Sequence, residues 1–235
     1  INRMILTPSN AEKTNLQETI DNMNFNSINY LIELAENNKI KIKNYSRIIN
    51  FWVESTIAER RLDRQSGPNA MGKALWSPQR SNDGSDQYRN MRLIEPLDII
   101  FHLADTRENL RIAGISVAES KVDLSFQGVE GTRWGGKPCY RVSLKDYIEL
   151  ETPINKSEFF DNPEYKERLV QIHQEYKDLF YDSNISLRQG GYLTKAPFDL
   201  VNVFNDIYNN KTNSNLPHYE KFKNLLKKQS WAISA

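Results

Sequence analysis

The sequence predicts a mixed α/β (α+β) fold, in which about five or six short strands form a curled sheet or barrel flanked by helices. Two observations predict it. Short runs of β-branched and aromatic residues, separated by turn residues, occupy much of the stretch between residues 40 and 152. Apolar residues at helical spacing precede this stretch and return after Pro153.

The predicted strands are apolar or alternating runs that end at Gly, Pro, Asn or Asp. They are Ile40–Lys43, Ile48–Val53, Ala74–Ser77, Ile99–Leu103, Leu110–Val117 and Cys139–Leu144. The fourth and fifth runs are separated by the turn Thr106–Asn109 and predict a buried β-hairpin. So many short strands in succession favour a closed or strongly curled sheet over a flat one.

Helices are predicted on both sides of the strands. Asn162-Pro163-Glu164 is a typical helix start, and an apolar face follows it as far as Phe180. A second helix is expected to open at Pro197. The chain therefore divides into an N-terminal helical extension (1–47), a central domain (48–212) and a basic C-terminal helix or tail (213–235).

Composition excludes several classes of protein. With 31 Lys+Arg against 30 Asp+Glu, the net charge of +1 does not indicate a polyanion partner. No apolar run has the roughly 18–20 residues of a membrane span, and no signal peptide is recognised. The single cysteine, Cys139, allows no internal disulfide, which favours a reducing, cytoplasmic setting.

No motif for catalysis stands out. The sequence contains no Gly-rich phosphate loop, no zinc-ligand spacing and no nucleophile elbow. His102 lies within an apolar strand, where a structural role is the favoured interpretation. Glu175 and Lys177 are residue types found in nucleases, but they lie in a predicted helix. We therefore expect no catalytic residue, no metal and no cofactor.

Two tryptophans have unusual neighbours. Trp76 ends a short strand directly after a basic loop, and Trp134 lies between glycines and cations in Arg133-Trp134-Gly135-Gly136-Lys137. A tryptophan in such a setting is typical of a surface or pocket mouth, although packing alone explains each one about as well. Together they suggest a site where aromatic rings receive a flat ligand and basic side chains hold its phosphates.

From Asn50 to about Tyr208 the sequence resembles the EVE/YTH branch of the PUA-like superfamily, whose members bind modified nucleobases. Four segments carry the resemblance. The first two are Phe51–Ser55 and Leu75–Ser77, and the last is Leu187–Gly191. The third consists of Gly114–Ser116, Thr132–Gly136 and Tyr140–Val142 in that order. Within this group, the motifs of the sequence most resemble those of the recognition domains of McrB-type modification-dependent restriction systems. The loop Thr56–Lys73 is longer than in YTH proteins, and the third wall of the aromatic cage is less clear.

The resemblance implies a base-flipping mechanism. Trp76 and Trp134 would sandwich the flipped base, while Ser77, Ser55 and Thr56 would hydrogen-bond its edge. Phe126 or Leu124 would provide the third wall. The candidate phosphate contacts are Arg60, Arg61, Arg64, Lys73, Arg133, Lys137 and Arg188. The Arg-rich loop can equally be a solvated segment with no ligand.

The function implied is a non-catalytic module that recognises a modified base in double-stranded DNA for a restriction or defence system. The nuclease or AAA+ NTPase would then lie in another domain or subunit. An RNA reader of N6-methyladenine is the alternative within the binding class. A nuclease with a composite active site, and an interaction protein that docks a partner through its terminal helices, are the alternatives from other classes.

Overall fold

The computed structural model describes residues 49–57, 61–106 and 109–224. The chain separates into two units, Ile1–Ser46 and Arg47–Ala235, and the described residues all belong to the second. The predicted N-terminal extension, the predicted strand Ile40–Lys43 and the candidate residue Arg60 lie outside the described residues. Near the C-terminus, the chain is helical at 219–224, where the described part ends.

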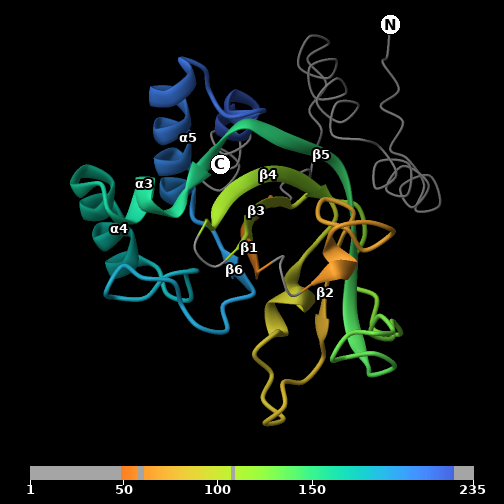
Figure 1. The fold of residues 1–235 in the computed structure, drawn as a ribbon. Coiled ribbons are helices and arrows are strands. Elements are labelled where there is room, and N and C mark those ends of the chain that lie inside the picture. The colour runs from red at the N-terminus through yellow and green to blue at the C-terminus, as the bar shows by residue number, and fades with distance from the viewer. Residues whose placement is uncertain (1–48, 58–60, 107–108, 225–235) are drawn as a thin grey trace, which may run out of the picture. The chain divides into compact units, whose positions relative to one another are not determined.

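A curled sheet of six strands is the framework of this unit (Figure 1). The strands are β1 (Phe51–Ile57), β2 (Ala74–Pro78), β3 (Ile99–Asp105), β4 (Arg111–Ala118), β5 (Cys139–Asn155) and β6 (Leu193–Lys195). Their order in the sheet is β2-β5-β4-β3-β1-β6, with β1 and β3 parallel and the other neighbours antiparallel. The predicted fold class and the predicted β3–β4 hairpin are both confirmed.

The length of β5 explains the curl. The sequence predicts a strand only to Leu144, but β5 continues to Asn155 and pairs with two neighbours in turn. Its first residues pair with β2, and from Leu144 onward it pairs with β4. The β4–β5 register shifts between Ile112 and Gly114 and again between Ile115 and Val117. Such irregularities bend a strand and increase its twist, so β5 wraps around one side of the sheet.

The helices are α3 (Lys156–Phe160), α4 (Pro163–Glu175) and α5 (Phe198–Thr212), with short 3-10 turns η2 (Leu62–Arg64) and η3 (Arg89–Leu93). α4 begins as predicted, since the Asn162 side chain accepts a hydrogen bond from the Glu164 backbone N–H. It ends earlier than predicted, before Asp178, whose φ of 59° is not helical. Within the described residues, no helix is long and apolar enough to cross a membrane.

The two faces of the sheet have different partners. On one face Phe101 packs against Phe204 of α5, with ring centroids 5.6 Å apart. The opposite face is turned into the curl, where Trp52, Leu75 and Val142 form a buried apolar cluster. Farther along β1 and β3, the paired residues Glu54 and His102 are polar although both strands are otherwise largely apolar. The functional candidates gather at this polar end.

Candidate functional site

A cavity of about 580 Å³ opens beside the ends of β1 and β2. Residues from the ends of both strands, from the loop before η2 and from the loop that carries Trp134 form its walls. The segment 187–192, which leads into β6, closes another side. The lining residues are Ser55, Thr56, Ile57, Arg61, Trp76, Ser77, Pro78, Tyr88, Leu110, Trp134, Leu187, Arg188, Gln189, Gly190, Gly191 and Tyr192.

This cavity brings together most of the base-pocket residues expected from the sequence, although they come from segments far apart in the chain. Both tryptophans line it, together with the three hydroxyl residues Ser55, Thr56 and Ser77. Among the candidate phosphate contacts, Arg61 and Arg188 also line it. The fold therefore places these side chains around one space, and their role in binding remains a proposal.

Trp76 is held by an ion pair. Its indole Nε1–H donates to Asp63 Oδ2 at 2.7 Å, and the Arg61 guanidinium lies 4.3 Å from the ring centroid. Arg61 in turn donates two 3.0 Å hydrogen bonds to Asp63. Burial opposes ionisation of Asp63, but the bonds from Arg61 and Trp76 outweigh it and lower the pKa of this carboxyl. The ion pair therefore fixes both the ring and the cation above it.

This arrangement changes the expected sandwich. Trp76 has no exposed surface, and the Arg61 guanidinium covers one face of its ring. A base therefore cannot stack on that face of the indole while Arg61 stays in place. It can stack on the flat guanidinium, because arginine stacks on aromatic rings and on nucleobases.

Trp134 provides a half-buried ring on another wall of the cavity. Arg133 and Lys137 lie over this ring, at 5.3 and 5.1 Å from its centroid. Both cations are exposed, so they surround the indole with positive charge at the cavity mouth. Their position suits contacts to the phosphates of a bound nucleic acid.

Ser77 supplies a hydrogen-bonding group with no partner. It is 2% exposed and lines the cavity, and its Oγ makes no hydrogen bond to any of the described residues. By contrast, the Thr56 hydroxyl donates to Glu54 Oε1 at 3.0 Å. Buried polar atoms in proteins are nearly always paired, so the unpaired hydroxyl of a residue that lines a cavity indicates a ligand or water contact. Ser77 is therefore the strongest candidate for reading a base edge.

Arg64 is a correction to the predicted phosphate contacts. It is 4% exposed and lies inside the fold, where its guanidinium bonds to the backbone oxygens of Asn69 and Ala74. Its Nη2 lies 2.5 Å from Glu54 Oε1. A guanidinium enclosed in this way has no access to a phosphate. The Arg-rich loop misled the prediction, because the acidic partner comes from β1.

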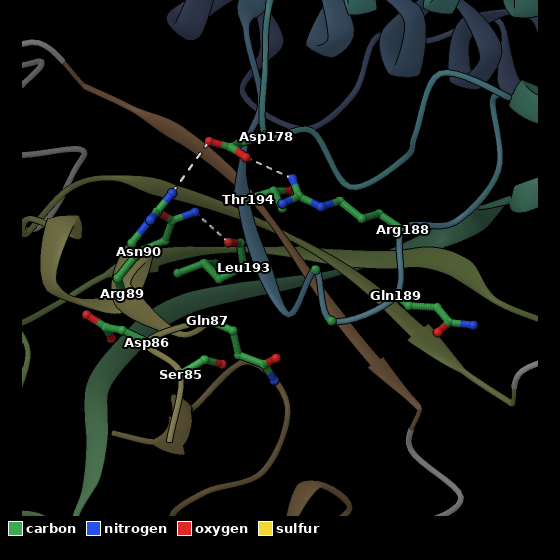
Figure 2. A pocket seen from close by; sticks show the side chains of 12 residues that line it. Ser85, Asp86, Gln87, Arg89, Asn90, Asp178, Arg188, Gln189, Leu193 and Thr194 are labelled. Carbon is green, nitrogen blue, oxygen red and sulfur yellow. Dashed lines mark hydrogen bonds and ion pairs between the residues drawn. The ribbon is translucent and has the colours of Figure 1, made fainter. Parts of the chain in front are cut away.

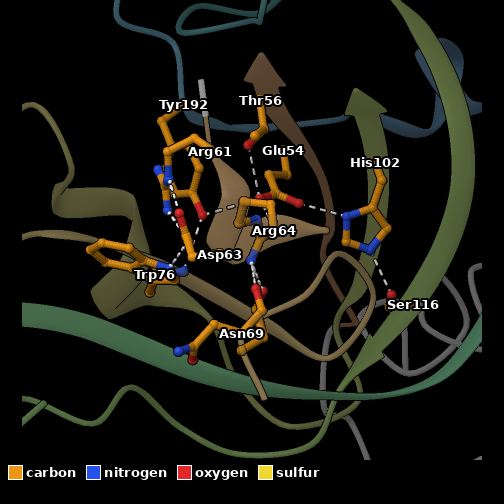
Figure 3. A network of polar contacts seen from close by, with 11 residues as sticks. Glu54, Thr56, Arg61, Asp63, Arg64, Asn69, Trp76, His102, Ser116 and Tyr192 are labelled. Carbon is orange, nitrogen blue, oxygen red and sulfur yellow. Dashed lines mark hydrogen bonds and ion pairs between the residues drawn. The ribbon is translucent and has the colours of Figure 1, made fainter. Parts of the chain in front are cut away.

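Glu54 is the centre of a buried polar network that reaches the cavity wall (Figure 3). Besides Arg64, it contacts His102 Nδ1 at 2.6 Å, and His102 Nε2 lies 2.5 Å from Ser116 Oγ. The Tyr192 hydroxyl donates to Glu54 at 3.1 Å and accepts from the Trp76 backbone N–H, also at 3.1 Å. The structural role expected for His102 fits this fully paired, solvent-free position.

The network predicts acid-sensitive stability. Burial opposes ionisation of Glu54, but Arg64 and His102 outweigh it and lower its pKa from 4.5 to about 2. Because the folded-state pKa is the lower one, the stabilisation is present above about pH 4.5 and is lost as pH falls towards 2. We expect a loss on the order of 3 kcal/mol from this group. Urea unfolding at pH 7, 5, 4 and 3 measures it, and a flat profile would contradict the assignment.

The remaining predicted residues lie outside the cavity wall. Phe126 packs edge-on against Trp76, with centroids 5.9 Å apart, so it supports that ring from the side. Lys73 and Leu124 are exposed and are not among the lining residues. The sequence prediction missed Tyr192, although this tyrosine directly follows the Gly190-Gly191 pair. No group of three or more metal-ligating side chains occurs in the described part of the chain.

No protein-family model matches the sequence, and no curated protein matches it significantly. Solved structures with a similar fold include a protein from Pseudomonas putida, with a TM-score of 0.45 and 10% identity, covering 67% of this chain and 99% of that one. Another is human THYN1 in complex with 5-methylcytosine-containing DNA, with a TM-score of 0.41, 10% identity and coverage of 68% and 97%.

A third is the N-terminal domain of Staphylothermus marinus McrB, with a TM-score of 0.37, 14% identity and coverage of 69% and 96%. At such low identity and TM-score, these likenesses carry no information about ligands. What the structure itself establishes is the curled six-stranded mixed sheet with few helices. This is the architecture implied by the resemblance of the sequence to PUA-like domains.

Proposed function

We propose that this chain is a non-catalytic module that binds a modified base flipped out of DNA into the cavity beside Trp134. The observation that carries the proposal is the unpaired, buried Ser77 hydroxyl in a cavity of about 580 Å³ that also holds Trp134 and the Arg61–Trp76 stack. This volume is within the usual range for small-ligand pockets. Two flat groups and a buried, unpaired hydroxyl match the chemistry of a nucleobase.

Stacking and edge contacts would offset the cost of flipping. Extruding a base from a duplex costs a few kcal/mol, and stacking on an aromatic side chain contributes about 1–3 kcal/mol per base. In the cavity, Trp134 would hold one face of the base and the Arg61 guanidinium, supported by Trp76, would hold the other. Ser77 would bond the base edge. A single methyl group adds only about 1–3 kcal/mol of selectivity.

Exposed cations around the cavity would hold the DNA backbone. Arg133, Lys137 and Arg188 are exposed, and each lies on or beside a lining segment. Phosphate contacts of this kind position the DNA without selecting a base, and they weaken as salt concentration rises. Any cleavage for restriction or defence would then depend on a nuclease or AAA+ NTPase in another domain or subunit.

The test is binding of the full chain to duplexes that carry 5-methylcytosine, 5-hydroxymethylcytosine or N6-methyladenine, each compared with its unmodified duplex. We expect one modification to be preferred by roughly 10- to 200-fold, the range that a single methyl-sized difference gives. RNA of the same sequence should bind more weakly; tighter binding of methylated RNA would favour the RNA-reader alternative. Equal binding of every modified and unmodified probe would contradict the proposal.

The Ser77→Ala variant tests the edge contact. We expect the preference for the modified duplex to fall by about 5- to 10-fold, because the hydroxyl is a buried, unpaired polar group of the cavity wall. Arg133→Ala is the matched comparison: it should weaken binding to modified and unmodified duplexes equally and reduce the salt dependence. Isothermal titration calorimetry at two salt concentrations distinguishes the loss of modification preference from the uniform loss of affinity. A uniform loss of affinity in Ser77→Ala would remove Ser77 from the site.

A further inference from the structure

A second cavity, of about 410 Å³, adjoins the first (Figure 2). Its walls come from the loop before η3, from η3 itself, from Asp178 and from β6. The turn formed by Arg188, Gln189, Gly190 and Gly191 belongs to the walls of both cavities. A ligand that fills the first cavity and continues over this turn therefore reaches the second.

Two buried polar atoms of residues that line this cavity have no partner among the described residues. Thr194 is 3% exposed, and its Oγ1 makes no hydrogen bond. Asp86 Oδ1 is also buried and unpaired, although Asp86 Oδ2 accepts a 2.6 Å bond from Arg92. Since unpaired buried polar atoms destabilise a fold, their presence at one cavity indicates that a ligand or water completes them.

The chemistry of these atoms selects the ligand. A carboxylate oxygen only accepts hydrogen bonds, whereas a threonine hydroxyl donates or accepts. Cytosine and adenine present an exocyclic amino group that donates, and guanine and thymine present a carbonyl oxygen at the corresponding edge. The amino group would satisfy Asp86 Oδ1, while a carbonyl oxygen would face the carboxylate unfavourably.

The rim of the cavity fits a phosphate. Arg188 Nη1 lies 3.0 Å from one oxygen of Asp178, and Arg89 Nη2 lies 3.9 Å from the other. Figure 2 shows the two guanidinium groups approaching this carboxylate from different sides. All three side chains are at least 45% exposed, so their pairing is weak and open to competition by a phosphodiester, which also carries negative oxygens.

We propose that this second cavity reads the nucleotide next to the flipped base and prefers cytosine or adenine, the two bases with an amino group at the major-groove edge. The inference rests on the proposed function, because the flipped base places its neighbour at the shared turn. Asp86 Oδ1 and Thr194 Oγ1 contact the neighbouring base, and Arg89 with Arg188 holds the phosphate between the two nucleotides.

The experiment measures affinity of the full chain for the preferred modified duplex with each of the four bases placed in turn on either side of the modification. We expect cytosine or adenine to bind about 5- to 10-fold tighter than guanine or thymine on one side, with little effect on the other. The Asp86→Asn variant should reverse this preference. Its oxygen would stay with Arg92, so its amide N–H₂ group would face the cavity and favour a carbonyl oxygen.

Three comparisons complete the test. Thr194→Val should weaken the neighbour preference, and Thr194→Ser, which keeps the hydroxyl, should restore it. Asp123→Asn removes one negative charge, as Asp86→Asn does, but on a different loop, and it should leave the neighbour preference intact. If wild type prefers the modified base but is indifferent to both neighbours, the second cavity is wrongly assigned while the proposed function stands. If wild type shows no modification preference, both proposals fail.

Discussion

Replacing Glu54 by glutamine should lower the free energy of unfolding by about 3–5 kcal/mol. The Arg64 side chain is 2% exposed, so it would keep its charge in the interior without a counter-ion. The glutamine amide would also place a donor near Arg64 or near His102, both of which now approach a carboxylate oxygen. Removing one member of a buried ion pair is strongly destabilising for this reason.

The matched comparison is Asp206→Asn. Asp206 pairs with Arg168 at 2.7 Å, but both side chains are about a third to a half exposed, so the loss should stay below about 1 kcal/mol. Urea unfolding at pH 7, followed by circular dichroism, gives both values. A loss for Glu54→Gln as small as that for Asp206→Asn would show that the buried network does not hold the strands together.

Replacing Gly128 by alanine should lower affinity for the preferred modified duplex roughly 10- to 100-fold, as expected if one stacking contact is lost. A Cβ at this position would lie 2.0 Å from the backbone oxygen of Trp134 and 3.1 Å from Cys139 Sγ. The first contact is to backbone, so the loop that carries Trp134 must shift. The indole would then leave the wall of the cavity while the sheet itself remains folded.

Gly131→Asn is the comparison in the same loop. Gly131 has a φ of +80°, which asparagine tolerates better than most residues, and a Cβ there meets nothing within 4 Å. Its affinity should therefore stay close to that of wild type. Fluorescence anisotropy with labelled duplexes gives the affinities, and thermal melting confirms that both variants fold. Unchanged binding by Gly128→Ala, with Trp134 shown to have moved, would exclude the indole from the site.

The sequence predicts much of the cavity because its chemistry lies at recognisable boundaries. Trp76 and Ser77 end a strand before a proline, and Trp134 sits between cations and glycines, so each has a local signal. For the same reason the predicted bounds of β2 and β4 lie within one residue of the observed ones, and those of β3 within two, since turn residues delimit these strands. Turn residues and strand ends are the features that a single sequence shows most clearly.

Long-range pairing explains what the sequence prediction missed. From the sequence, Arg64 is indistinguishable from the other arginines of its loop, which are predicted to be solvated. Only the fold brings Glu54 of β1 against it. Glu54 and His102 each interrupt an apolar run, but their adjacency depends on the parallel register of β1 and β3. Likewise, β6 has only three residues, too few for an alternating pattern, and so Tyr192 beside it was not assigned to the site.

The most direct test of base enclosure uses 2-aminopurine placed next to the preferred modified base in a duplex. Its fluorescence rises when the neighbouring base leaves the stack, so it reports flipping in solution. We predict a rise on addition of wild-type chain, a much smaller rise with the unmodified duplex, and loss of the rise with Trp134→Ala. Tight, modification-selective binding with no change in fluorescence would contradict the account, because the base would then be recognised inside the duplex.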